Sequence, residues 1–150
     1  MYLSGDYRHK LPDNGRLTLP AALRKDISKE CPEGELPDTL KVVLSIEGDS
    51  LWVFREEEFD AWVQSFFADR DKPLSRDKKA LELRRALTSR GKNVDLDKAG
   101  RFGIPADQRR EAELGNDVVL LGVDDHFEIW NAKRWDEYKV TIDLTSLAYS

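Results

Sequence analysis

The chain has 150 residues, of which 40% are hydrophobic and 35% are charged, and its formal net charge is −5. This hydrophobic content is sufficient for one folded core, while no apolar run approaches the roughly 20 residues that a membrane-spanning helix needs. The single cysteine, Cys31, excludes an internal disulfide, and residues 1–6 lack a signal-peptide pattern, so we expect a cytoplasmic protein.

The first elements predict a β-hairpin. Residues 7–11 and 16–19 are the expected strands, and the Asn14-Gly15 dipeptide between them is a strong hairpin signal. Pro20 follows, and a proline presets the φ of the first helical residue, so a short helix is expected next.

Two strands and two helices complete the first half. Residues 40–46 and 51–54 are almost continuously apolar and predict a pair of central strands. The next segment predicts an amphipathic helix with five large apolar residues on one face: Phe59, Trp62, Val63, Phe66 and Phe67. Residues 75–90 predict the longest helix, which has outward basic residues and ends at Gly91.

The second half of the chain repeats the first. Residues 11–20 return as residues 96–105 at an offset of 85, in the same order of strand, glycine turn, arginine, strand and proline. Asp97 and Gly100 stand at the first and fourth positions of the second turn, as a type I turn prefers. The proline again predicts a helix, which is expected to end near Gly115.

A second block repeats at an offset of 76. Residues 42–44 match residues 118–120, and the strand at 51–54 matches residues 127–130. The difference of nine residues predicts a loop insertion around residues 31–37. Because each copy alone is marginal in size, we expect a pseudo-twofold unit whose two copies share one core.

Charge is distributed unevenly along the chain. Residues 70–92 hold nine Lys and Arg against three Asp and Glu, a net charge of +6, and residues 5–24 carry +2. The remaining residues carry −13. A net acidic chain argues against a nucleic-acid partner, because phosphate binding depends on lysine and arginine, but local basic segments reduce that objection.

The chain holds two copies of one pattern, with a basic helix between them: a hairpin, a Gly-Arg step, a proline-led helix and a buried strand pair. This arrangement resembles the MraZ family of bacterial transcriptional regulators, whose members carry two SpoVT-AbrB-type motifs. The family signature Asp-x-x-x-Arg is complete in the second copy, from Asp97 to Arg101. In the first copy Pro12 occupies the aspartate position, Asp13 comes one place late, and Asn14 replaces a frequent lysine. Asp13, or Pro12 together with Asn14-Gly15, could close this turn.

The resemblance implies an α+β, mainly β fold: a duplicated AbrB-type swapped-hairpin β-barrel that forms an intramolecular pseudo-dimer, with flanking short helices and one bridging helix. Its expected parts are a first repeat at 5–68, a bridging basic helix at 69–90, a second repeat at 91–140 and a C-terminal tail at 141–150.

The resemblance also implies a sequence-specific DNA-binding regulator. Family members bind G-rich direct repeats upstream of the division and cell-wall gene cluster and repress that promoter. The expected partners are double-stranded DNA and further copies of the chain in a ring-like homo-oligomer. No cofactor, metal, catalytic residue, small-molecule substrate or membrane is expected, and the protein would be nucleoid-associated in the cytoplasm.

The candidate DNA-binding residues lie in the two turns and on the first strand: Arg16, Arg8, Lys10, Arg101, Asn14 and Lys98. The candidate turn-forming residues are Asp13, Gly15, Asp97 and Gly100. An arginine can donate two hydrogen bonds to the O6/N7 edge of guanine. Arg101 could instead pair with Asp97, four residues away, whereas Arg16 lacks such a fixed aspartate and is the favoured base contact.

Other basic residues leave alternatives open. Arg8 and Lys10 could lie over phosphates or on an ordinary solvated strand face. The basic helix at 75–90 could contact DNA, remain solvated, or contact the acidic residues 56–58 of another subunit.

Two rival functions remain. A protein-interaction module of the antitoxin type, without operator binding, would use the same scaffold, and its binding would respond weakly to salt. An enzyme is disfavoured, because His9 and His126 lack metal-ligand partners at useful spacing. The sequence also lacks the Gly-x-x-x-x-Gly-Lys and Gly-x-Ser-x-Gly motifs of nucleotide hydrolysis and acyl transfer.

Overall fold

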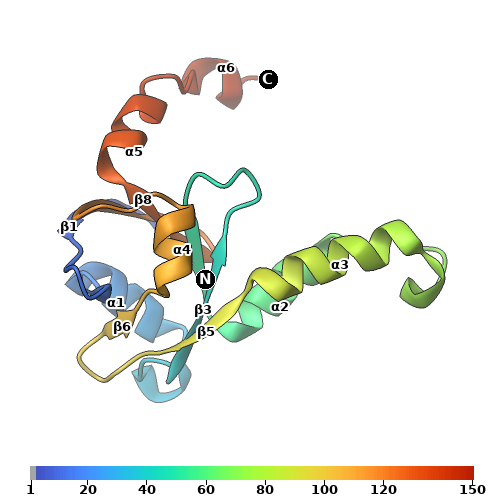
Figure 1. Cartoon of the computed structure of the whole chain (residues 1–150), viewed down its shortest axis with the longest axis horizontal. Helices are drawn as coiled ribbons and strands as arrows, with labels where there is room; N and C mark the ends of the chain where they lie inside the picture. The colour runs from blue at the N-terminus through green and yellow to red at the C-terminus, as the bar shows by residue number, and fades with distance from the viewer. Residues whose placement is uncertain (1–2) are drawn as a thin grey trace.

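The computed structural model describes residues 3–150, which form an α+β fold with two antiparallel sheets and six α-helices (Figure 1). The strands are β1 (Asp6–Lys10), β2 (Arg16–Thr18), β3 (Thr39–Leu44), β4 (Leu51–Phe54), β5 (Lys92–Asp95), β6 (Arg101–Gly103), β7 (Asp117–Val123) and β8 (His126–Asn131). The helices are α1 (Ala21–Lys29), α2 (Glu56–Ser65), α3 (Lys78–Arg90), α4 (Ala106–Glu111), α5 (Ala132–Lys139) and α6 (Leu144–Ala148). Within this range, no helix has the length and apolar character needed to cross a membrane.

Each repeat contributes its first strand to the other repeat's half of the larger sheet. The strand order is β1-β7-β8-β4-β3-β5, so β1 pairs with β7 and β5 pairs with β3. The pair β4–β8 joins the two halves at the centre. Because neither repeat completes its half of the sheet alone, the two copies fold as one unit.

Two strand pairs lie on the pseudo-twofold axis that relates the repeats. In the pair β2–β6, Leu17 lies opposite Phe102, its equivalent at the offset of 85. In the pair β4–β8, Trp52 lies opposite Glu128, its equivalent at the offset of 76. A residue pairs with its own equivalent only where the symmetry axis crosses the ladder. The repeat in the sequence is therefore a twofold relation in space.

The α+β fold with antiparallel sheets and its duplication are confirmed, but the strands do not close into a barrel. β1 and β5 form the two edges of the six-stranded sheet. β2 and β6 hydrogen-bond with each other as a separate two-stranded ribbon, called the β2–β6 ribbon below. The ribbon packs over one face of the open sheet. It covers the apolar face that a closed barrel would enclose.

The main core lies between the β2–β6 ribbon and the sheet. Leu17 and Phe102 of the ribbon are fully buried there against alternate residues of the central strands. On the opposite face of the sheet, α2 covers Phe54 in the first half and α5 covers Trp130 in the second. Alternation along each strand thus supplies one apolar face to the ribbon and the other to the helices.

Two hydrogen bonds locate the extra residues of the first repeat. Leu96 donates its N–H to the carbonyl of Asp38, and the equivalent Leu11 donates to the carbonyl of Asn116. Asp38 and Asn116 are therefore equivalent at an offset of 78, and the predicted match between β3 and β7 at an offset of 76 is wrong by two places. Seven of the nine extra residues precede β3, and two lie in the β3–β4 turn.

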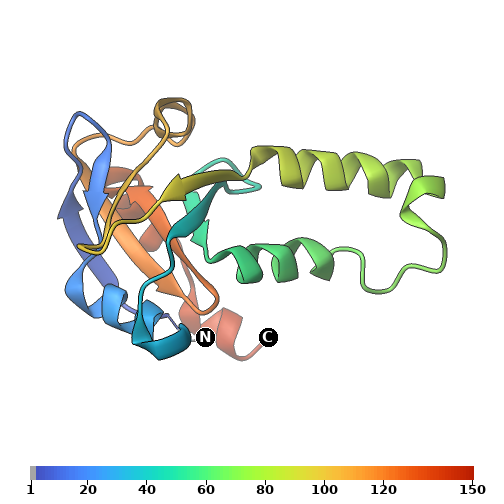
Figure 2. The ribbon, with the colours of Figure 1, turned by 90° about the horizontal axis from the view of Figure 1, so that it is seen from below.

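The helices α2 and α3 form an arm that projects away from the sheet (Figure 2). At the base of this arm, Phe59 and Val63 of α2 pack with Leu87 of α3, as the predicted apolar faces require. Phe66 follows the end of α2 and is more exposed, with 38% of its surface accessible. The arm carries the basic segment of the sequence away from the ribbon.

Two helix boundaries differ from the sequence-based expectation. α3 starts after Asp77, because the Asp77 side chain accepts the N–H of Ala80 (Oδ1–N 3.1 Å) and caps the helix there. α4 ends before the predicted stop at Gly115, because Glu113 adopts a left-handed φ of 55°. The two residues that follow its C-cap donate back to α4 carbonyls, which is a Schellman ending.

Candidate nucleic-acid interface

The β2–β6 ribbon exposes two of the predicted DNA-binding arginines on one face. Alternation along its strands buries Leu17 and Phe102 and turns Arg16 and Arg101 outward, with 49% and 53% of their side-chain surface exposed. Arg16 lies opposite Gly103, which places the two arginines diagonally across the ladder. Long side chains in diagonal positions can meet. The two arginine turns of the sequence therefore form one site.

One carboxylate joins both arginines. Asp97 Oδ2 accepts from Nη2 of Arg16 at 3.0 Å and from Nε of Arg101 at 2.8 Å. The ion pair between Arg101 and Asp97 agrees with the alternative drawn from the sequence. The expectation that Arg16 lacks an aspartate partner is wrong, because the partner comes from the other repeat.

The same aspartate closes the second turn. Asp97 Oδ1 accepts the backbone N–H groups of Ala99 and Arg101, both at 2.9 Å, and the Asp97 carbonyl accepts from Gly100. The backbone hydrogen bond from Arg101, together with bonds from both arginine side chains, lowers the pKa of Asp97 to about 2. Asp97 is therefore ionised at neutral pH. Its Oδ1 closes the turn, and its Oδ2 holds the two arginine side chains.

Asn14 closes the first turn. Its side-chain oxygen accepts the N–H of Arg16 at 2.9 Å, and Gly15 donates its N–H to the carbonyl of Pro12 at 2.9 Å. Asp13 does not take the aspartate role, because its carboxylate accepts from the side chain of Asn116 at 2.8 Å. The side chain of Asn14 thus makes the backbone contact that Asp97 makes in the second turn, which leaves no carboxylate of the first turn beside Arg16.

Two further arginines hold the turns from the opposite repeat. Arg24 of α1 donates to the carbonyls of Lys98 and Ala99 in the second turn. Arg109 of α4 donates from Nη1 to the carbonyl of Asp13 in the first turn at 3.0 Å. Each turn is therefore held by the helix that follows the other turn.

Arg24 and Arg109 are not among the candidate residues named from the sequence, although the sequence holds a signal for them. They stand 85 positions apart, the same offset that relates Arg16 to Arg101. Each arginine lies one turn into the short helix of its repeat. Its recurrence at the repeat offset predicts that it makes the equivalent contact in both repeats.

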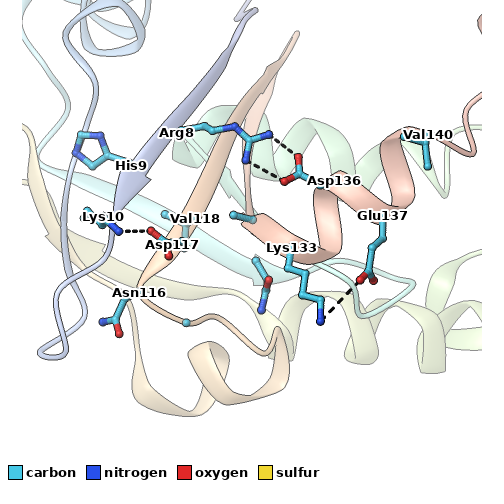
Figure 3. A pocket seen from close by; sticks show the side chains of 13 residues that line it. Arg8, His9, Lys10, Asn116, Asp117, Val118, Lys133, Asp136, Glu137 and Val140 are labelled. Atoms are coloured by element: carbon cyan, nitrogen blue, oxygen red, sulfur yellow. Dashed lines mark hydrogen bonds and ion pairs between the residues drawn. The ribbon is translucent and has the colours of Figure 1, made fainter.

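Arg8 and Lys10 lie elsewhere, on the edge strand β1. Arg8 pairs with Asp136 of α5, and Lys10 pairs with Asp117 at the start of β7 (Figure 3). These residues line a cavity of about 1140 Å³ between β1 and α5. The bidentate contact with Arg8 lowers the pKa of Asp136. The structure thus does not place Arg8 and Lys10 with the arginines of the β2–β6 ribbon.

Lys98 and the basic helix complete the candidate residues. The side chain of Lys98 is exposed at the tip of the second turn, while its carbonyl is held by α1. In the arm, Arg84 lies over the ring of Phe67, and Arg70 pairs with Asp77. Part of the basic charge in this segment is therefore used within the arm itself.

Comparison with known proteins identifies the family. A family model described as "MraZ protein, putative antitoxin-like" matches residues 2–81 and 87–148. The chain is 29% identical over 136 residues to the transcriptional regulator MraZ of Treponema denticola, covering 91% of this chain and 86% of that protein. It is 35% identical to the MraZ regulator of Mycolicibacterium smegmatis over 136 residues, covering 90% and 85%. It is 36% identical to that of Nocardia farcinica over 135 residues, covering 89% and 84%.

The match extends over both repeats and includes the ribbon, while residues 82–86 of α3 lie between the two matched segments. The chain belongs to the MraZ family, whose curated members above are named transcriptional regulators.

Proposed function

We propose that this protein regulates transcription by binding duplex DNA through the outer face of the β2–β6 ribbon. Its operator is a set of G-rich direct repeats upstream of the division and cell-wall gene cluster, and binding represses that promoter. The observation that carries the proposal is the pair Arg16 and Arg101, half-exposed on one face of a two-stranded ribbon. The names of the relatives support a role in transcription.

The dimensions and chemistry of the ribbon suit the major groove. That groove admits a two-stranded β-ribbon, and arginine donating to guanine O6 and N7 is its commonest specific contact. Each such contact discriminates against a wrong base by about 1 to 3 kcal/mol. Arg16 and Arg101 are the base-reading residues of the proposal, and Asn14 and Lys98 at the turn tips lie beside the phosphates.

Arg8 and Lys10 have a secondary place in the proposal. Both are exposed but already paired with carboxylates, so each would reach a phosphate only by exchanging its partner. Phosphate contacts position a protein on DNA without reading its sequence. Loss of either residue should therefore weaken binding to all sequences alike.

Several copies act together. A net charge of −5 gives a single chain little attraction to DNA, and linked sites multiply affinity through effective concentration. A ring-like homo-oligomer would present one ribbon per chain at regular intervals, which matches direct repeats. The protein would then act at the nucleoid in the cytoplasm, without an enzymatic step or a cofactor.

The test is fluorescence anisotropy with a duplex of G-rich direct repeats and a scrambled duplex, at about 50 and 200 mM salt. The wild-type protein should prefer the repeats and lose affinity at the higher salt. Arg16→Ala should reduce affinity for the repeats by about tenfold or more and abolish most of the preference. Arg85→Ala, which removes an exposed arginine from α3, is the matched control and should leave the preference intact.

Other outcomes would redirect the proposal. An equal loss in Arg85→Ala would move the DNA-binding surface to the arm. Equal binding of both duplexes by the wild-type protein would contradict sequence-specific recognition.

A second candidate function, binding of a protein partner without an operator, is favoured by the apolar C-terminal segment. Val140, Leu144, Leu147 and Tyr149 have 83%, 74%, 66% and 87% of their surface exposed. Figure 1 shows α6 standing away from both sheets. Binding through this segment should depend weakly on salt, which distinguishes it from phosphate-driven DNA binding.

A further inference from the structure

Within residues 3–150, Asp97 is the only ionised residue of the two turns whose side chain accepts hydrogen bonds from the arginines of the ribbon. Its Oδ2 accepts from Arg16 and from Arg101, while its Oδ1 serves the backbone of its own turn. The repeat-equivalent position holds Pro12, whose side chain has no acceptor. Two guanidinium groups from two repeats therefore share one oxygen atom.

We propose that Asp97 is a positioning residue that joins Arg16 and Arg101 into one composite reader of DNA. Each chain would then recognise a single block of neighbouring base pairs, rather than two separate blocks with one arginine each. This inference rests on the proposed function, and it adds a residue and a mode of recognition to it.

The donors of the two arginines permit this role. A guanidinium carries five N–H donors on three nitrogens. Arg101 uses Nε for Asp97, so both of its terminal nitrogens are available, and Arg16 uses Nη2, so its Nη1 and Nε are available. Asp97 can therefore hold both side chains while each still offers donors to a base edge.

The spacing of the site favours one block of base pairs. A nitrogen of Arg16 and a nitrogen of Arg101 both lie within 3.0 Å of the same oxygen. Base pairs along B-DNA are separated by about 3.4 Å. Two guanidinium groups held around one atom therefore reach the same or adjacent base pairs, and they cannot serve sites a helical turn apart.

The charge of the cluster is suited to DNA. Two cations against one carboxylate leave a net positive site, with about half of each arginine side chain exposed. Holding a long side chain in place before binding reduces the conformational entropy lost on binding. The held arginines should therefore discriminate between sequences better than mobile ones, even though Asp97 itself repels phosphate.

The decisive variant is Asp97→Asn. Its side-chain oxygen can still accept the N–H groups of Ala99 and Arg101, which preserves the turn, but its NH₂ group cannot accept from either guanidinium. We expect affinity for the scrambled duplex to rise, because a negative charge is lost, and the preference for the repeat duplex to fall by about tenfold. Asp60→Asn makes the same charge change on the exposed face of α2 and should leave the preference unchanged.

A rescue variant uses the pseudo-twofold symmetry. Pro12→Asp places a carboxylate at the position equivalent to Asp97, on the other side of the same arginine pair. In the Asp97→Asn background it should restore part of the preference. A merely structural role of Asp97 would not be restored in this way, because the second turn stays unchanged.

Two readouts separate this inference from the proposed function. In DNA-free protein, the Nε–H of Arg101 should exchange with solvent about tenfold faster in Asp97→Asn than in the wild type, as seen by NMR. In DNA binding, Arg16→Ala and Arg101→Ala should be non-additive, because the residues act as one unit. The wild-type protein could prefer the repeats while the two arginine variants are additive and Asp97→Asn keeps the full preference. That result overturns the role of Asp97 and leaves the proposed function standing. A slowly exchanging Nε–H in a protein without any sequence preference overturns the proposed function.

Discussion

Arg109 donates a hydrogen bond from Nη1 to the backbone carbonyl of Asp13 at 3.0 Å, so the second repeat holds the turn of the first. Arg24 makes the reciprocal contact with the second turn. The loops that present Arg16 and Arg101 are therefore not independent hairpin tips. Their geometry depends on the docking of one repeat on the other.

Removal of each bracing arginine should loosen the turn of the opposite repeat. In Arg109→Met the carbonyls of Asp13 and Ile104 lose a charged donor, so we expect faster hydrogen exchange at the amide of Gly15. Hydrogen bonds from charged donors contribute about 1.5 to 3 kcal/mol, which corresponds to an increase of about tenfold or more. Arg24→Met should act on the second turn instead. The measurement is amide exchange by NMR, and faster exchange in a variant's own turn only would contradict the reciprocal bracing.

Gly15→Ala should destabilise the protein more than Gly48→Ala. Both glycines have left-handed φ angles, 76° and 77°, at which an alanine costs about 1 to 2 kcal/mol. A Cβ on Gly15 would also lie 2.6 Å from Cζ of Arg109, whereas a Cβ on Gly48 meets nothing within 4 Å. We expect an additional loss of about 1 to 3 kcal/mol in Gly15→Ala, because the bracing arginine must move. Urea unfolding measures both variants, and equal losses would show that Arg109 moves aside freely.

Leu87→Ala should destabilise the helical arm where it joins the sheet. Leu87 is 3% exposed and packs with Phe59 and Val63 of α2, so its truncation should cost about 2 to 5 kcal/mol of unfolding free energy. Leu83→Ala is the matched control on the same helix, because Leu83 is 38% exposed. Thermal or urea unfolding compares the two. Similar losses for both would contradict a packing of the arm through Leu87.

The buried His126 should make stability depend on pH. Burial disfavours its charged form, but hydrogen bonds to Glu128 and Asp125 outweigh burial and raise the pKa of His126 above 6.5. A raised pKa in the folded state stabilises the protein fully below pH 6.5, and this stabilisation is lost as the pH rises through the folded-state pKa. The ring also stacks on Trp52, with centroids 4.2 Å apart.

The measurement is urea unfolding of wild type and His126→Gln between pH 5.5 and 8. The wild-type protein should lose more unfolding free energy over this range than the variant does. His9→Gln, on the strand β1, is the control for loss of a histidine and should retain the wild-type dependence. An identical pH dependence in wild type and His126→Gln would assign the titration to another group.

Much of the fold could be predicted from local signals. Asn14-Gly15 and Asp97 with Gly100 mark the two turns because few residue types satisfy those backbone geometries. The short helix expected after Pro20 forms as α1, in which Leu23 and Ile27 are buried. The predicted start of α3 and the predicted end of α4 were wrong. The capping side chain of Asp77 and the left-handed φ of Glu113 set these boundaries instead of the periodic pattern.

The duplication, the strand and turn order, and the identity of the arginines at the turns can be derived from the amino-acid sequence, because these features depend on residues close together in the chain. The packing of the whole chain is what brings Asp97 to both Arg16 and Arg101, and Arg24 and Arg109 to the turns of the opposite repeats. Those contacts join groups from different repeats. No pattern of local spacing specifies which side chains meet when the pseudo-twofold axis brings two strands together, since that depends on the packing of the β2–β6 ribbon on the sheet.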